Sequence, residues 1–255
     1  MERVVAGLPV VTGPQWAGVN YFCTTRAGGA GVAPHDTLNL GRRAGDDPDT
    51  VAENRRRVRA AVPDEPLWLR QVHGSEVVDA DRADLPEEPA VDASVTARPG
   101  RVLAVMVADC LPVVIADAQG TVLGAAHAGW RGLSGGVLEN TLAAMRAKAP
   151  QAAGWRAWVG PGIGPQAFEV GQDVLDAFVA QAEDARRYFT PRPERPGKWL
   201  ADLAGLADFR LRRAGVEEVH LSGLCTVAQA DRFFSYRRDG ETGRMALLAW
   251  LQRNS

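Results

Sequence analysis

The sequence predicts one α/β domain over residues 1–255, built from mixed β-sheets that are flanked by helices. The chain has 255 residues, of which 46% are hydrophobic and 24% charged, as is typical of a globular protein. Short β-branched apolar runs alternate with segments of helical periodicity, which favours the α/β class. No linker or change in composition divides the chain, and a domain of this length can bury a sizeable core.

Apolar runs bounded by glycine, proline or other turn residues predict the strands. The clearest two are RVLAVMVA at 101–108 and PVVIAD at 112–117. Two polar stretches, 81–89 and 190–197, are predicted to be loops within the same domain. The predicted strands are 21–25, 77–79, 101–108, 112–117, 121–126, 155–159, 219–222 and 244–251.

Four helices are predicted between these strands from capping residues and apolar spacing. Asp49 is expected to cap a helix over 50–61. Ser134 is expected to cap a helix over 135–149, where apolar residues recur at spacings of three and four. The other two predicted helices span 173–181 and 202–214.

Composition excludes several classes of protein. The net charge is −2 and the pI near 6.1, so the chain lacks the basic excess of a nucleic-acid binder. No GxxxxGK[ST] motif is present, which excludes a P-loop nucleotidase. An odd number of cysteines argues against a disulfide framework, and glycines and prolines near the N-terminus interrupt any leader or membrane helix. We therefore expect a cytoplasmic protein that binds no membrane.

Two histidines and one cysteine carry the strongest chemical signal. His73 lies in QVHG, Cys110 in ADCLPV and His127 in HAGWRG, each beside the end of a predicted strand. Two imidazoles and one thiolate suit Zn²⁺, and three protein ligands leave a fourth position open, as in catalytic zinc sites. The three residues are 37 and 17 positions apart (73 to 110 and 110 to 127), so the fold must assemble the site.

The same residues allow an alternative without metal. Cys110 and a histidine can form a nucleophile–base pair, with Asp109 as the carboxylate that orients the base. In the metal-dependent hypothesis, Asp109 instead orients a zinc ligand or moves protons. Alkylation of Cys110 without loss of metal would favour the nucleophile pair.

Four arginines are candidates for binding an anion. Arg131 lies just before the helix predicted at 135–149, whose first N–H groups would attract negative charge. The segment GPGIGP at 160–165 does not match GxGxxG and is predicted to be a stiff loop that shapes a pocket wall. The four arginines are Arg26, Arg131, Arg237 and Arg238.

The remaining histidines and cysteines are predicted to be structural. His35 lies in a polar loop and is expected to be solvated, whereas His220 lies in a predicted strand and is expected to be packed. Cys23 and Cys225 have apolar neighbours and are expected to be small core residues.

The order and spacing of the motifs resemble the YfiH family, once called the laccase-domain family and also linked to a peptidoglycan editing factor. This resemblance implies a YfiH-like α/β sandwich and a zinc site made of His73, Cys110 and His127. It also implies phosphorolysis of adenosine, inosine, guanosine and methylthioadenosine, and deamination of adenosine. Phe168 stands where the family often has Tyr. The motifs that carry the resemblance are TTRAGG (24–29), LNLG (38–41), DDP…NR (46–55), QVHG (71–74), ADCLPV (108–113), HAGWRG (127–132), GPGIG (160–164), FEVG (168–171) and FFSYRRDGETGRMA (233–246).

The leading hypothesis is therefore a zinc-dependent purine nucleoside phosphorylase with adenosine deaminase activity, whose partners are a small-molecule nucleoside and phosphate. In deamination, a zinc-activated water would attack C6 of adenine. Arg26 and Arg131 are expected to hold phosphate near C1′ of the ribose, and Asn39 and Gln71 to hydrogen-bond the base or sugar. The full set of substrate-binding candidates is Arg26, Asn39, Gln71, Arg131, Arg237 and Arg238.

Two other functions remain open at this point. One is an amidase that removes a wrongly incorporated serine from a UDP-linked muramoyl precursor, and the other is a zinc-binding module without enzymatic activity. A multicopper oxidase is disfavoured because the chain has four histidines and no HxH pair. A Cys/His₂ site can still take up Cu²⁺ in vitro, since Cu²⁺ outcompetes Zn²⁺. The sequence does not set the oligomeric state, and we favour a monomer.

Overall fold

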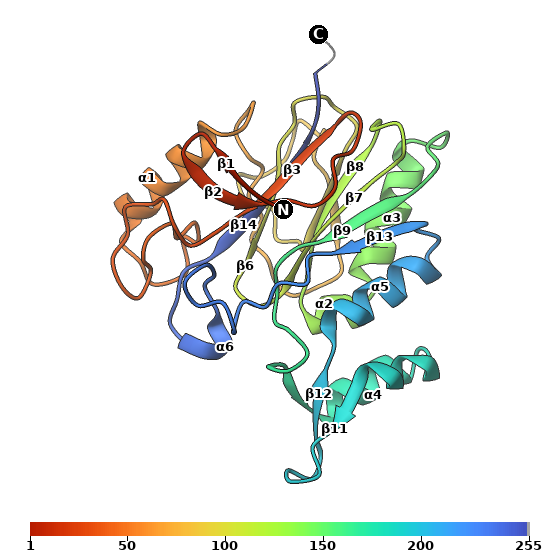
Figure 1. Ribbon diagram of the computed structural model, residues 1–255. Helices are drawn as coiled ribbons and strands as arrows, with labels where there is room; N and C mark the ends of the chain where they lie inside the picture. Colours follow the sequence, from red (N-terminus) through yellow and green to blue (C-terminus); the bar gives the residue numbers. More distant parts are fainter. Residues whose placement is uncertain (254–255) are drawn as a thin grey trace.

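The computed structural model describes residues 1–253 and contains two large β-sheets, one small sheet and several helices (Figure 1). All strand pairs of the first sheet are antiparallel. Its strands lie in the order β1 (Glu2–Val5), β2 (Leu8–Val11), β3 (Val19–Thr24), β14 (Met245–Leu251) and β6 (Leu103–Val107).

The second sheet is mixed. Its two outer pairs, β13 with β9 and β4 with β5, are parallel, and the inner pairs are antiparallel. The strands lie in the order β13 (Glu218–Leu221), β9 (Arg156–Val159), β7 (Leu111–Ala116), β8 (Leu123–Ala128), β5 (Ala93–Thr96) and β4 (Val77–Asp79).

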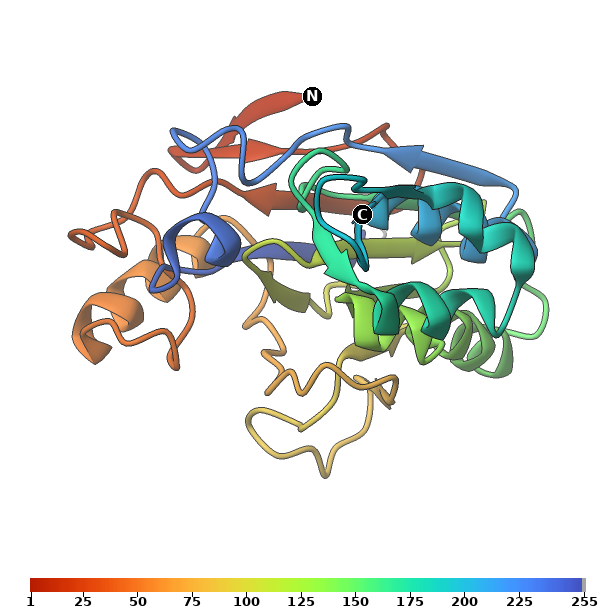
Figure 2. The same cartoon turned by 90° about the horizontal axis from the view of Figure 1, so that it is seen from below.

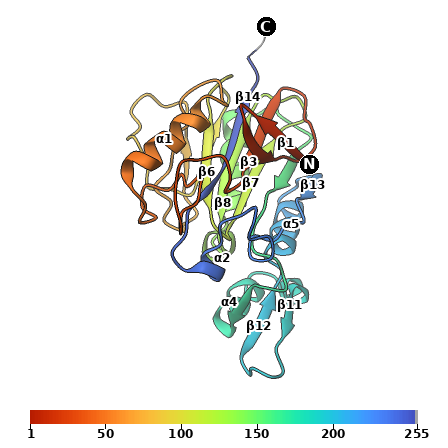
Figure 3. The same cartoon turned by 60° about the vertical axis from the view of Figure 1, so that its left-hand side comes forward.

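A third sheet forms a small lobe that projects from one end of the molecule, together with α4 (Figures 1 and 3). Its strands are β10 (Glu169–Gly171), β12 (Lys198–Ala201) and β11 (Phe189–Pro191). The helices are α1 (Pro48–Arg59), α2 (Trp130–Ser134), α3 (Val137–Lys148), α4 (Gln172–Val179), α5 (Leu203–Arg213) and α6 (Tyr236–Asp239), with a 3₁₀-helix over Glu183–Tyr188.

The two large sheets stack face to face between helices. β14 shows why: Leu247 packs into the core between the sheets, whereas its neighbour Leu248 faces the cluster under α1. Such a strand is buried on both faces, which explains its continuous apolar sequence. Helices α3 and α5 cover the outer face of the second sheet, so the molecule has α/β/β/α layers, with α1 and α5 on opposite sides (Figures 2 and 3).

This architecture confirms the predicted class, an α/β fold with mixed sheets flanked by helices, although one large sheet is wholly antiparallel. All eight predicted strands are present; β4 has the predicted ends and the other seven have shifted ends. Six further strands were missed because they are short, polar or at sheet edges: β1, β2, β5, β10, β11 and β12. The loop predicted at 190–197 is in fact the end of β11 and the turn into β12, whereas 81–89 contains no helix or strand.

Two predicted helix caps are wrong. Asp47, not Asp49, caps α1, because its carboxylate accepts the Thr50 N–H at 2.8 Å and Pro48 occupies the first turn. Ser134 ends α2, and α3 begins after Gly136, whose φ of +93° breaks the chain direction between the two helices. Among residues 1–253, no helix has both the length and the apolar composition that a lipid bilayer requires.

Candidate metal centre

The three predicted ligands converge where the chain passes from one large sheet to the other. Cys110 lies in the short turn between β6 of the first sheet and β7 of the second. His127 lies near the end of β8, which pairs with β7, and not in the loop after it as predicted. His73 is contributed by the loop that precedes β4.

The geometry fits a tetrahedral metal ion. One ligand atom from each of His73, Cys110 and His127 lies within 4.8 Å of the others. The Cys110 Sγ and His73 Nε2 atoms are 3.9 Å apart, and the two imidazole rings meet edge to face with centroids 4.9 Å apart. Donor atoms around zinc are separated by about 3.5 Å, so a small contraction would complete the set. Among the described residues, His73, Cys110 and His127 form the group of at least three His, Cys, Asp or Glu side chains that is spaced closely enough to hold a metal ion.

Asp92 organises two of the ligands, and the sequence analysis missed it. Its carboxylate is fully buried and accepts the Nδ1–H of His127 at 2.8 Å, which leaves Nε2 of that ring for a metal. It also accepts the backbone N–H groups of His73 at 3.0 Å and Gly74 at 2.7 Å. Burial opposes ionisation of Asp92, but the hydrogen bonds from His127 and Gly74 outweigh it and lower its pKa.

Cys110 and His127 favour their charged forms. Burial raises the pKa of the Cys110 thiol, but the charge of His127 and hydrogen bonds with both histidines outweigh it, giving a value of about 6. Burial lowers the pKa of His127, but the Cys110 thiolate and Asp92 raise it to about 9. A thiolate at neutral pH suits both a metal ligand and the alternative nucleophile pair.

The backbone around the ligands is strained and closely packed. His73 and Asp109 have positive φ values of 59° and 95°, which non-glycine residues rarely adopt. At Gly129, an added Cβ would lie 2.8 Å from the Cys110 Sγ and 3.2 Å from the His73 ring. The HAGWRG motif thus has glycine where a side chain would occupy the metal centre.

Asp109 does not contact the histidines as the nucleophile-pair hypothesis expects. One carboxylate oxygen accepts the Thr226 hydroxyl at 2.6 Å, and the other accepts the Arg237 backbone N–H at 2.6 Å. Asp109 therefore ties the Cys110 turn to the start of α6. Its orienting role toward a histidine belongs to Asp92 in this structure.

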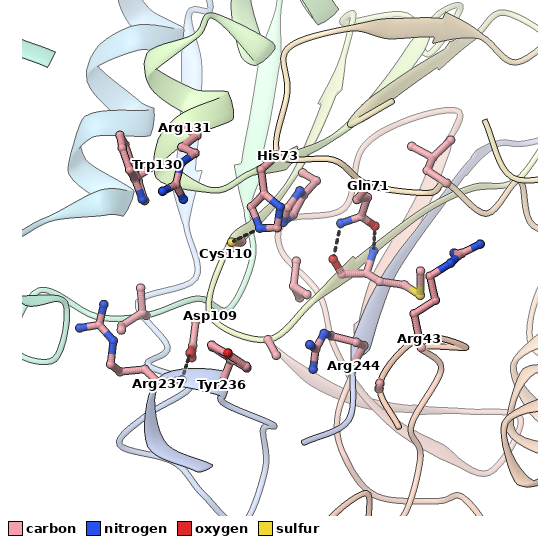
Figure 4. A pocket seen from close by; sticks show the side chains of 18 of the residues that line it. Arg43, Gln71, His73, Asp109, Cys110, Trp130, Arg131, Tyr236, Arg237 and Arg244 are labelled. Carbon is pink, nitrogen blue, oxygen red and sulfur yellow. Dashed lines mark hydrogen bonds between the residues drawn. The ribbon is translucent and has the colours of Figure 1, made fainter. Parts of the chain in front are cut away.

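A cavity of about 570 Å³ opens over the three ligands (Figure 4). Trp130, Ile163 and Phe168 form an apolar part of its wall, and the position of Ile163 agrees with the predicted role of the 160–165 loop. Phe168 comes from the segment that leads into the small lobe. Tyr236 also lines the cavity. The volume is in the range of small-molecule sites.

The predicted substrate-binding residues divide into two groups. Arg131, Arg237 and Gln71 line the cavity. The Gln71 amide is nevertheless already paired, because it donates to the Met106 carbonyl and accepts the Met106 N–H, both at 2.7 Å. Gln71 thus fixes the loop carrying His73 to the edge of β6, which uses one donor and one acceptor of its amide.

Arg26, Asn39 and Arg238 do not line the cavity. Arg26 pairs with Asp36 at 3.0 Å and donates to the Ala230 carbonyl. Arg238 donates to backbone carbonyls and pairs with its neighbour Asp239. Asn39 is fully buried, and its amide bonds to other protein groups. The side chains of these three residues are therefore engaged in bonds within the protein rather than facing the cavity.

Two expectations about other residues are wrong. His35 is 3% exposed rather than solvated, because its ring Nε2–H donates to the Ala44 carbonyl at 2.8 Å and the ring lies beside Asp46. The His220 side chain is 43% exposed rather than packed, since β13 lies at a sheet edge. Cys23 is fully buried as expected, whereas Cys225 is half-buried.

Arg244 is a cavity residue that the sequence analysis did not select. It lies directly before β14 and points into the cavity between Tyr236 and Gln71 (Figure 4). Burial lowers its pKa despite the nearby Cys110 and Asp109. It is part of the FFSYRRDGETGRMA motif, but that motif contains three arginines and gives no sign of which one faces a ligand.

The layered α/β fold brings together a His–Cys–His group that could hold a single metal ion. The chain belongs to the family described as multi-copper polyphenol oxidoreductase laccase, whose model matches residues 20–252. A purine nucleoside phosphorylase from Pseudomonas aeruginosa is 48% identical over 94% of this chain and 97% of its own length. Purine nucleoside phosphorylase YfiH of Escherichia coli is 46% identical over 93% of this chain and 97% of its own.

Solved structures show the same fold. A Neisseria meningitidis protein, described as a member of the DUF152 family, superposes with a TM-score of 0.88 at 46% identity, covering 96% of this chain and 98% of that chain. YlmD from Geobacillus stearothermophilus gives a TM-score of 0.83 at 32% identity over 94% of each chain. These findings confirm the YfiH-type resemblance and the fold it implied.

Proposed function

We propose that this protein is a zinc-dependent purine nucleoside phosphorylase acting on adenosine, inosine, guanosine and methylthioadenosine, with adenosine deaminase activity. The names of the relatives from Pseudomonas aeruginosa and Escherichia coli support the phosphorylase activity. The observation that carries the proposal is the convergence of His73, Cys110 and His127 on the wall of a cavity large enough for a nucleoside. Three free cysteines suit a reducing compartment, and we propose the cytoplasm.

Zinc fits the donor set better than a multicopper centre does. Two imidazoles and a thiolate are preferred zinc ligands, and the fourth position remains available to substrate or water. A multicopper oxidase needs many more histidine ligands than the four in this chain, which include no HxH pair. The family description therefore names a chemistry that these residues do not support, although the site can bind Cu²⁺ in vitro.

The chain's own residues would position the reactants. In phosphorolysis, a phosphate oxygen attacks C1′, the C1′–N9 bond breaks and its electron pair leaves with the purine. Trp130, Ile163 and Phe168 offer apolar surface for packing the purine and excluding water. Arg131 lines the same cavity and has no carboxylate partner among residues 1–253. When bound, the metal would supply Lewis-acid polarisation at the reacting groups.

A product assay tests this function and separates it from the alternatives. Purified protein is incubated with adenosine and orthophosphate, with and without a chelator, and products are resolved by chromatography. We expect phosphate-dependent release of adenine and ribose 1-phosphate, with inosine from deamination, and loss of all three products in the chelator.

Each alternative predicts a different outcome. Release of free serine from a muramoyl-serine precursor, without adenine release, would replace the phosphorylase by an amidase. Bound zinc without turnover of either substrate would indicate a binding module. Adenine release that persists in the chelator and in apo protein would contradict the metal-dependent proposal.

A further inference from the structure

Arg244 is held in place by an arrangement of neighbours built around it. Its backbone N–H donates to the Asn39 side chain at 2.9 Å, and its carbonyl accepts the Leu40 N–H at 3.0 Å. Its Nη1 donates to the carbonyls of Thr242 at 2.7 Å and Gly243 at 3.0 Å. These bonds fix the guanidinium at the cavity wall and leave Nε and Nη2 available, so less side-chain entropy is lost on binding a ligand.

The glycine of LNLG belongs to the same arrangement. A Cβ added at Gly41 would lie 2.7 Å from Cγ of Arg244 and 3.3 Å from its Cβ. Any side chain at position 41 would therefore displace the Arg244 stem. The two motifs LNLG and FFSYRRDGETGRMA meet here, and both serve to place one guanidinium.

The guanidinium of Arg244 makes no direct ion pair with a described residue, and it interacts with the charges of Cys110 and Asp109 only at longer range. Among residues 1–253, no carboxylate lies within ion-pair distance of its guanidinium, whose hydrogen bonds go only to backbone carbonyls. Arg42 and Arg43, which also line the cavity, differ in this respect, because Arg42 pairs with Glu87 at 2.6 Å and Arg43 with Glu88 at 2.7 Å. A half-buried cation that keeps free donors and has no directly paired carboxylate is suited to bind an anion.

We propose that Arg244 anchors a phosphate-binding subsite on the side of the cavity opposite Trp130 and Arg131. Its free Nε and Nη2 edge can bind two oxygens of a tetrahedral oxyanion at once. The Tyr236 ring lies 6.0 Å from the guanidinium carbon and closes this side of the cavity. This proposal rests on the proposed function for one point only, the choice of phosphate as the ligand.

Phosphate oxygens at this subsite can come from two sources. One is free orthophosphate, the co-substrate of phosphorolysis. The other is an ester phosphate that belongs to the substrate, as in a nucleoside monophosphate. Both present the same oxyanion to Arg244, so binding must be measured with each.

Calorimetric titration of the zinc-loaded protein with orthophosphate, and separately with adenosine monophosphate, tests the proposal. We expect Arg244→Gln to weaken phosphate binding about tenfold to a hundredfold, as for loss of charge-assisted hydrogen bonds. The phosphate affinity of Arg244→Lys should lie between those of the wild type and Arg244→Gln, because lysine keeps the charge but lacks the planar guanidinium. Zinc content and adenosine binding should stay at the wild-type level.

Two further variants keep the test decisive. Gly41→Ala should reproduce the loss of phosphate binding without removing the arginine, so the test survives if Arg244→Gln fails to fold. Arg186→Gln changes an exposed arginine outside the cavity that already pairs with Glu183 at 2.9 Å, and this variant should bind phosphate like the wild type. Equal phosphate affinity in the wild type, Arg244→Gln and Gly41→Ala would overturn the subsite. Phosphate binding that depends on Arg244 without any release of adenine would uphold the subsite and contradict only the phosphorylase.

Discussion

Asp92 joins two of the three candidate metal ligands through one carboxylate. It holds the His127 ring by Nδ1 and the His73 loop by backbone N–H groups. It thereby sets both the ring face that His127 presents and the positive φ that His73 adopts. A carboxylate behind a metal-bound histidine commonly fixes its tautomer and raises its basicity.

We predict that Asp92→Asn weakens zinc binding. The amide keeps the shape of the side chain but loses the charge that orients and polarises His127. Zinc affinity, measured by competition with a chromogenic chelator, should fall about tenfold to a hundredfold. Cobalt-substituted protein should show an altered thiolate-to-metal absorption band.

Asp117→Asn is the matched control. Asp117 is equally buried and also accepts backbone N–H groups, from Thr121 and Val122, but it lies away from the ligands. It should lower the free energy of unfolding without changing zinc affinity. Wild-type zinc affinity in Asp92→Asn would refute the positioning role.

At this scale the sequence predicted the ligands but not their supports. His73, Cys110 and His127 could be selected because their chemistry is distinctive and they flank strands. Asp92 could not, since the chain has many aspartates and only the folded loop shows what this one bonds. Arg26 and Arg244 illustrate the same limit, because ion pairing decides which arginine stays free.

Helix α1 holds the segment that forms one wall of the cavity. Asn54 is fully buried and donates to the carbonyls of Thr37 and Asn39, both at 3.0 Å. Arg55 donates to the Leu40 carbonyl at 3.0 Å, pairs with Glu88 at 3.1 Å and stacks on the Trp68 ring. The segment that places Asn39 and Gly41 therefore depends on polar contacts to this helix.

Glu88→Gln should destabilise this attachment in a pH-dependent way. Burial raises the pKa of Glu88, but hydrogen bonds from Arg43 and Arg55 outweigh it and lower the pKa. A carboxyl with a lowered folded-state pKa stabilises the protein above its unfolded pKa of about 4.3 and loses that effect as pH falls through the folded value. The variant should therefore lose roughly 1–3 kcal/mol at pH 7.

Urea unfolding at pH 7 and below pH 4 measures the difference between the two proteins. The gap between wild type and Glu88→Gln should shrink at the lower pH. Glu87→Gln, whose side chain is 79% exposed, should change stability little at either pH. A gap that is constant with pH would show that the Glu88 charge is not what holds α1.

Element prediction succeeded where the periodic signal was strong. β6, β7 and β14 are long apolar runs buried on both faces, and α5 (Leu203–Arg213) matches the helix predicted over 202–214 to within one residue at each end. The helix predicted over 173–181 is α4 of the small lobe, but the sheet of the lobe was missed because its strands are only three or four residues long and contain polar positions. The end of β8 was misplaced because HAGWRG reads as a loop, yet His127 pairs with Pro112 in the sheet.

The whole molecule brings the site together by stacking two sheets. Cys110 sits at the crossover between them, His127 on the neighbouring strand, and Phe168 at the base of the small lobe. Spacing in the sequence cannot reveal such a site, because the pairing of β7 with β8 is what places His127 beside the Cys110 turn. Local sequence patterns selected the three ligands one by one, and the resemblance to a known family implied that they form one site.

Metal content is the most direct measurement of the central claim. Purified wild-type protein and Cys110→Ala, each shown to be folded by circular dichroism, are analysed by inductively coupled plasma mass spectrometry after dialysis with zinc. We predict about one zinc per wild-type chain and almost none in the variant, with loss of adenine release in parallel. Wild-type protein without bound metal, or a variant that keeps both its zinc and its activity, would contradict the account.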